Sequence, residues 1–210
     1  MPDTSLLSPF VVKLGGGLML DKDAFTLPPG AATQLQNFEP DINGGYRRIN
    51  GFTKYDSNQV GGSSGTILGV HIYKDQVIAA QGTAVYKGTG SGFTSIDTGR
   101  TSAGRYNFVN FNFDGTDKMI MVDGANSASS YNNTSVTDVS VSGAPADPAF
   151  VEVFRSHVFY AGMSASPQEL IFSEPFDEDG FTSGDGAGSI KVDGVIKGIK
   201  VFRESLFVFC

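Results

Sequence analysis

One pattern recurs along this chain and strongly limits what it can fold into. Each copy has an apolar run that ends in an aromatic residue, then a basic residue and a short turn, and then a second apolar run. The copies lie at 69–80, 150–161 and 198–209, and their aromatic residues are Tyr73, Phe154 and Phe202. A looser copy at 108–122 carries Phe113 in the aromatic position and has two extra residues before Met119. Each copy predicts two strands joined by a tight hairpin.

The spacing of the four aromatic residues is 40, 41 and 48 residues. Periods of this size are typical of β-propeller blades, which contain four strands each. Weaker third and fourth strands of the first repeat are predicted at 84–87 and 93–97. We therefore predict an all-β fold with β-propeller-like repeats of four-stranded antiparallel blades, incomplete in this chain, with about three and a half blades over residues 61–210. A sheet-rich sandwich with recurring hairpins is the alternative.

Local patterns agree with strands and turns. No segment keeps a 3.6-residue apolar period over three turns, whereas residues 106–113 nearly alternate aromatic and amide side chains, as a half-buried strand does. The same alternation predicts short strands at 139–141 and 190–192. Gly82-Thr83 and Asp123-Gly124 are predicted tight turns.

Residues 1–60 differ in composition from the repeats. They contain glycine and proline clusters such as 15–17 and 28–30, and we expect an extended N-terminal arm with one or two strands that pack on the repeats or close a ring. At the other end, the fourth repeat stops after its second predicted strand, at Cys210. We expect the open apolar edge there to be covered by a following segment or by another subunit.

Charge and cysteine content exclude some classes of protein. The formal net charge of −7 disfavours a broad nucleic-acid-binding surface, because phosphate binding needs a positive field. The single cysteine excludes an intrachain disulfide and a multi-cysteine zinc site. No apolar run approaches the roughly 20 residues that span a bilayer, so we expect no membrane span, and no secretory signal is visible at the N-terminus.

Few residues point to chemistry. His157 falls at a predicted exposed turn position, and His71 alternates with Val70 and Ile72, so it is expected on the opposite side of its strand. No Gly-x-Ser-x-Gly nucleophile elbow is present, and the glycine-rich stretches at 14–17 and 88–92 lack the pattern of a phosphate-binding loop. Arg47-Arg48 is the only adjacent basic pair, and we interpret it as a solvated or salt-bridged surface pair.

Residues 174–185 form the densest acidic cluster, with Glu174, Asp177, Glu178, Asp179 and Asp185. Such oxygen-rich loops can bind calcium, and paired carboxylates serve as the acid and nucleophile of glycosidases. The EF-hand spacing is absent, and so are tryptophans that would stack on sugars, so a solvated acidic loop is the favoured interpretation. We predict no catalytic, cofactor-binding or metal-binding residues, no cofactor and no enzymatic activity.

Several motifs together resemble one family of virion proteins. They are Leu-Gly-Gly-Gly-Leu at 14–18, Leu-Pro-Pro-Gly at 27–30, Leu-Gln-Asn-Phe at 35–38, Gly-Gly-Tyr-Arg-Arg-Ile-Asn-Gly-Phe at 44–52 with Tyr55, and the segments 170–176 and 190–209. This pattern resembles the tail nozzle proteins, or tail tubular proteins B, of short-tailed bacteriophages. Members of that family are usually much longer than this chain.

The resemblance implies a structural component of a phage tail, made in the host cytoplasm and located in the virion. It implies a homohexameric ring below the portal and adaptor proteins, in contact with tail fibres or tail tip proteins. β-Propellers in such a ring surround a channel through which DNA passes during ejection without specific binding, and acidic walls suit that passage because they repel phosphate.

Two other functions remain open from the sequence. The acidic loop 174–185 motivates a glycan-binding or glycan-hydrolysing β-propeller on a virion or cell surface, in which Asp177 and Asp179 would carry the activity. A third reading is a plain propeller scaffold with one ligand-binding face.

Overall fold

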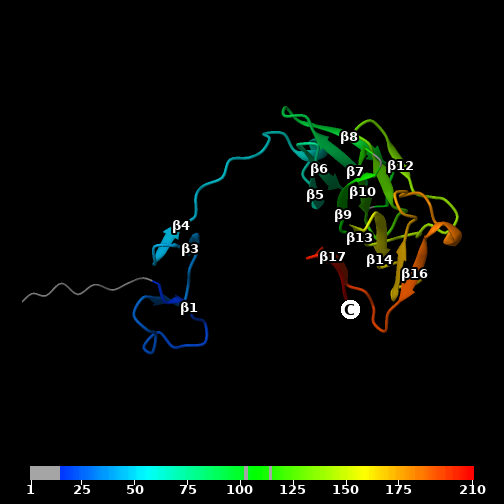
Figure 1. The fold of residues 1–210 in the computed structure, drawn as a ribbon. Helices are drawn as coiled ribbons and strands as arrows, with labels where there is room; N and C mark the ends of the chain where they lie inside the picture. The colour runs from blue at the N-terminus through cyan, green and yellow to red at the C-terminus, as the bar shows by residue number, and fades with distance from the viewer. Residues whose placement is uncertain (1–14, 102–103, 114) are drawn as a thin grey trace, which may run out of the picture. The chain divides into compact units, whose positions relative to one another are not determined.

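The computed structural model describes residues 15–101, 104–113 and 115–210, and the chain divides between Tyr55 and Asp56 into two compact units (Figure 1). Regular structure in the described residues is almost entirely β. The two exceptions are the short 3-10 helices η2 (Val60–Gly62) and η3 (Ser183–Asp185). The predicted all-β class is therefore confirmed.

The first unit contains four very short strands. β1 (Gly17–Leu18) pairs in parallel with β2 (Ala31–Ala32), and β3 (Phe38–Pro40) pairs antiparallel with β4 (Tyr46–Arg48). None of residues 15–55 is buried. A segment of this size cannot remove enough apolar surface from water to build a core of its own. The closing of a ring by one of these strands stays a prediction.

The second unit contains three four-stranded sheets and one two-stranded sheet, and each strand pairs antiparallel with the next one along the chain. The first sheet consists of β5 (Ile67–Tyr73), β6 (Gln76–Gln81), β7 (Ala84–Gly88) and β8 (Phe93–Thr98). The second sheet consists of β9 (Asn107–Phe113), β10 (Thr116–Val122), β11 (Ser129–Tyr131) and β12 (Val136–Asp138). The third sheet consists of β13 (Phe150–Phe154), β14 (His157–Ala161), β15 (Glu169–Phe172) and β16 (Gly188–Lys191). The two-stranded sheet consists of β17 (Gly198–Phe202) and β18 (Ser205–Phe209).

The predicted hairpins and four-stranded antiparallel repeats are confirmed, including β7 and β8 at the expected third and fourth positions. The two extra residues of the second repeat lengthen its hairpin, since β9 and β10 pair over seven positions where β13 and β14 pair over five. The strand predicted at 139–141 is wrong: those residues follow β12, and Val139 is buried beneath the second sheet's outer strands without extending them. The strand predicted at 190–192 is displaced, because β16 ends at Lys191.

The hairpin turns explain the recurring sequence pattern. In three repeats the two turn residues both have positive φ, as a type I′ turn requires, and this turn matches the twist of the strands beside it. The turn residues are Lys74 (47°), Asp75 (60°), Arg155 (47°), Ser156 (65°), Arg203 (45°) and Glu204 (61°).

The basic residue that opens each of these turns lies over the ring of the aromatic residue before it. The distances to the ring centroid are 5.6 Å for Lys74 over Tyr73, 5.1 Å for Arg155 over Phe154 and 5.2 Å for Arg203 over Phe202. A cation over an aromatic face is attracted by the ring quadrupole. The aromatic–basic pair of the repeat therefore supports a turn conformation that these residues otherwise adopt reluctantly.

The sheets stack in chain order, and each strand divides its side chains between two neighbours because successive side chains point to opposite faces. We call the face that contacts the following sheet the forward face and the opposite one the rear face. Ile78 and Ala80 of the first sheet cluster with Met119 and Met121 of the second sheet. Farther along, the forward face of each sheet again meets the rear face of the next. The pairs are Ile120 and Val122 with Val158 and Tyr160, and then Phe159 and Ala161 with Ile199, Leu206 and Val208.

The first strands of successive sheets, β5, β9, β13 and β17, lie beside one another, and the first of these contacts depends on a glycine. A Cβ at Gly69 would lie 2.7 Å from Cβ of Tyr106 and 2.9 Å from the ring of Phe108. The Tyr106 amide donates to the carbonyl of Leu68 at 3.0 Å. Glycine is therefore needed here for close approach between β5 and β9.

Candidate functional site

The acidic cluster at 174–185 is a loop that follows β15 and is held by its own backbone. The Glu174 amide donates to the carbonyl of Gly180 at 2.8 Å, and Oε1 of Glu174 accepts from the Thr182 amide at 2.8 Å. Oδ1 of Asp177 accepts from the Asp179 amide at 2.9 Å. Two of the carboxylates thus fix the loop's conformation.

A third carboxylate of this loop joins two sheets. Nζ of Lys118, on β10, donates to Oε1 of Glu178, and the side chains are 27% and 6% exposed. This ion pair connects the second sheet to the loop that follows the third sheet. The loop therefore serves the contact between the sheets.

Two buried oxygen atoms accompany this ion pair. Burial, and then the negative charge of Glu178, raise the pKa of Asp179, against an opposing effect of Lys118. The Tyr160 hydroxyl and Oδ1 of Asp179 are both buried and have no hydrogen-bond partner among the described residues. Burial and the charges of Asp179 and Glu178 also raise the pKa of Tyr160. Among the described residues, no three His, Cys, Asp or Glu side chains are placed to hold a metal ion.

The two histidines are held by packing and hydrogen bonds. Nε2 of His71 lies 2.8 Å from Oδ1 of Asn110, and its ring stacks on Phe108 at 5.3 Å. His71 faces away from Val70 and Ile72, as predicted, and toward the second sheet. The exposed turn position predicted for His157 is wrong. His157 begins β14, is half-buried, and its Nδ1 lies 2.7 Å from the carbonyl of Ser173.

A buried arginine that sequence reasoning missed joins the first and second sheets. The Arg100 side chain is only 6% exposed. Its Nε donates to Asp97, its Nη2 donates to Oδ1 of Asp138 at 3.2 Å and to Ser129, and its Nη1 donates to the carbonyl of Ser127 at 3.3 Å. Burial lowers the pKa of Arg100, but the hydrogen bond and charge of Asp97 outweigh this and raise it. Arg100 stands alone in a loop between repeats, and no local motif marks it.

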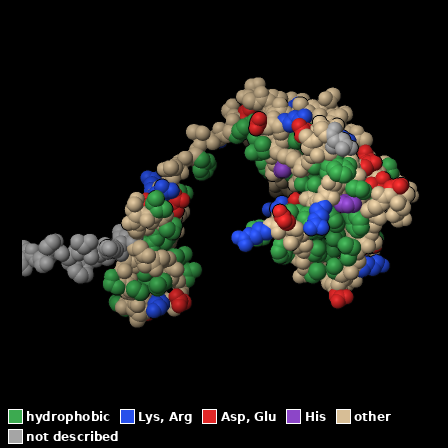
Figure 2. Space-filling view, viewed as in Figure 1, with side chains coloured by type: hydrophobic (Ala, Val, Ile, Leu, Met, Phe, Trp, Pro, Cys, Tyr) green, Lys and Arg blue, Asp and Glu red, His purple; other side chains and the backbone are tan. Residues whose placement is uncertain are grey.

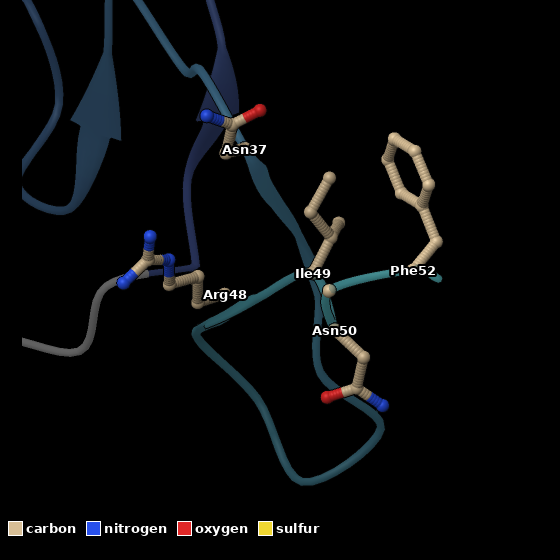
Figure 3. A pocket seen from close by; sticks show the side chains of 6 residues that line it. Asn37, Arg48, Ile49, Asn50 and Phe52 are labelled. Atoms are coloured by element: carbon tan, nitrogen blue, oxygen red, sulfur yellow. The ribbon is translucent and has the colours of Figure 1, made fainter. Parts of the chain in front are cut away.

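The arginine pair predicted as surface residues lies at the end of β4. Nε of Arg47 donates to Oε1 of Glu39 at 2.7 Å, with side chains 60% and 43% exposed, so this prediction is confirmed for Arg47. Arg48 lines a hollow of about 440 Å³ together with Asn37, Ile49, Asn50, Gly51 and Phe52. Figure 3 shows Arg48 directed to the opposite side of this segment from Phe52. The lining holds no carboxylate or histidine that would pair with it in acid–base chemistry.

Exposed apolar side chains gather in two regions. In the first unit they are Leu18, Leu20, Phe25, Phe38, Ile42, Ile49, Phe52 and Tyr55 (Figure 2). In the second unit they are found mainly on β5 and around β17–β18, as the next but one subsection describes. Exposed apolar patches of this kind mark interaction surfaces.

The fold and these sites define an all-β protein of stacked antiparallel sheets, whose buried charged side chains join one sheet to the next. No helix in the described residues is long and apolar enough to cross a membrane. A comparison of the chain with protein-family models gives no match, and a search of curated proteins gives none either.

Proposed function

We propose that this chain is a structural, non-enzymatic component of a phage tail, part of a nozzle or tail tube through which DNA passes during ejection. In this proposal the four sheets of residues 67–209 are blades of an incomplete β-propeller. The observation that carries the structural role is the use of charged side chains between sheets. The assignment to a phage tail rests on the sequence pattern of residues 14–55 and 170–209.

The internal ion pairs support a wall more than a reactive site. Glu178 and Arg100 are spent on contacts between neighbouring sheets, where catalysis would need them to converge on an open cavity. Stacked sheets with full hydrogen bonding inside each repeat are rigid, and rigidity suits a tube that must keep its bore during ejection.

The first unit supports a role in assembly. Its described residues contain no buried side chain, so its exposed apolar residues gain stability by packing on another surface. In the proposed homohexameric ring, that surface belongs to a neighbouring subunit or to the portal, adaptor, tail fibre or tail tip proteins. The net charge of −7 suits passage of DNA without binding.

Electron microscopy tests this proposal directly. Purified protein, and phage particles immunolabelled for this chain, are imaged and averaged. We expect a six-fold ring with a central channel, located below the portal in the particles. Labelled protein that is absent from the particles would refute the tail assignment, and a ring of other symmetry would refute the hexamer.

A glycan-acting propeller is the second candidate, and the geometry favours it less. Asp177 fixes a backbone turn, and Asp179 is half-buried beside the Glu178 carboxylate. Glycan-array binding and sugar release would be measured for the wild type, Asp177→Asn and Asp179→Asn. We expect no activity in any of the three. Activity that both substitutions abolish would replace the structural proposal.

A further inference from the structure

The stack of sheets in the second unit leaves one forward face and one rear face uncovered. Three contacts within the chain each join a forward face to the rear face of the following sheet. The forward face of the two-stranded sheet and the rear face of the first sheet have no such neighbour among the residues that the structure describes. Both faces are apolar.

The uncovered forward face belongs to β17 and β18. Leu206 and Val208 pack on the third sheet, so the alternate residues point away from it. Phe202, Phe207 and Phe209 are 58%, 46% and 54% exposed.

Residues at equivalent positions in the other repeats are buried. Counted from the hairpin turn, Phe207 and Phe209 correspond to Ile78 and Ala80 of β6, and to Phe159 and Ala161 of β14. Ile78, Ala80 and Ala161 are 0% exposed and Phe159 is 9% exposed, because the next sheet covers them. The repeat therefore shows what covers this face elsewhere: the rear face of another sheet of the same kind.

The uncovered rear face belongs to the first sheet. Val70 and Ile72 of β5 are both 62% exposed and pair across the hairpin with Ala79 and Val77. The short helix η2 packs against β6, β7 and β8, so it covers the far side of this face and leaves β5 open. In the second and third sheets, the rear-face residues of the hairpin pack on the preceding sheet.

We propose that these two faces bind each other between copies of this chain. The forward face of β17–β18 in one copy packs on Val70 and Ile72 of β5 in a second copy. The contact is head-to-tail, because every sheet contact within the chain is forward to rear, and it repeats from copy to copy until a ring closes or a fibre grows. This inference does not rest on the tail assignment, since it depends only on the two faces.

Sedimentation velocity over a range of protein concentrations tests the contact. Three single variants are compared with the wild type: Phe207→Lys on the forward face, Ile72→Lys on the rear face, and Val141→Lys as a matched control. Val141 is 46% exposed and lies on neither face. We expect the wild type and the control to associate as concentration rises, and the two face variants to remain monomeric.

Mixing the two face variants separates head-to-tail contact from pairing of like faces. Each variant keeps one intact face, and the two intact faces are complementary. An equimolar mixture of Phe207→Lys and Ile72→Lys should therefore form a dimer and nothing larger. Far-UV circular dichroism and thermal unfolding check each variant's fold, and Phe209→Lys and Val70→Lys replace any variant that fails.

Three results would overturn the inference. The first is a wild type that stays monomeric at every concentration. The second is unchanged association of Ile72→Lys, which would indicate contact between two forward faces. The third is a mixture of the two folded variants that forms no dimer.

Discussion

Replacing Lys118 with methionine should lower the free energy of unfolding of the second unit by about 2–4 kcal/mol. Removing one partner of a buried ion pair typically costs about 3–5 kcal/mol, because the other charge stays buried and uncompensated. Here the Glu178 side chain is 6% exposed and the Lys118 side chain is 27% exposed. Water reaches one side of the pair, so we place the cost below the top of that range.

A second lysine in the same unit provides the matched control. Nζ of Lys74 lies 3.8 Å from Oδ2 of Asp117, and these side chains are 42% and 53% exposed. An exposed pair of this kind contributes about 1 kcal/mol or less. Lys74→Met should therefore cost much less than Lys118→Met.

Urea unfolding at pH 7, followed by far-UV circular dichroism, measures both variants. The double variant Lys118→Met with Glu178→Gln should be more stable than Lys118→Met alone, since it no longer buries an uncompensated charge. Equal losses for the two lysine variants, or no recovery in the double variant, would refute the role given to this ion pair.

Three further substitutions test other features by urea or thermal unfolding. Tyr160→Phe should be neutral within about 0.5 kcal/mol because its buried hydroxyl lacks a partner, whereas Tyr73→Phe should cost about 1 kcal/mol because it loses a 2.8 Å hydrogen bond. Since the pKa of Asp179 is raised, its ionisation removes stability as pH rises from the usual aspartate pKa through the raised value. Asp179→Asn should therefore stabilise the protein at pH 7 and reduce the loss of stability measured between pH 3 and pH 7. Gly69→Ala should cost about 1–3 kcal/mol, because its Cβ would lie 2.7 Å from Cβ of Tyr106, and a fully stable variant would contradict the close approach of β5 and β9.

The hairpins were predictable from the sequence because their determinants are local. An aromatic residue, a basic residue and one more turn residue lie next to one another in the chain, and together they set a type I′ turn with the cation over the ring. Alternating side chains then extend two strands from that turn. The third and fourth strands of the first repeat followed from the same alternation between glycine-rich turns.

Contacts between sheets were not predictable, because they depend on residues far apart in the chain. Arg100 meets Ser129 and Asp138 only after two sheets have stacked, and no spacing in the sequence marks them. His157 looked exposed because it follows a turn, yet stacking of the loop after β15 half-buries it. The acidic loop was recognised as a cluster, but its role depends on Lys118, which lies 60 residues away.

The order of stacking has a consequence for synthesis on the ribosome. Each four-stranded sheet closes its hydrogen bonds within one stretch of chain and then packs on the sheet made just before it. Such near-neighbour contacts carry a small loop-closure cost, so the unit can be laid down one sheet at a time as the polypeptide emerges. At every stage of that growth, the newest sheet displays the sticky surface on which the next will settle.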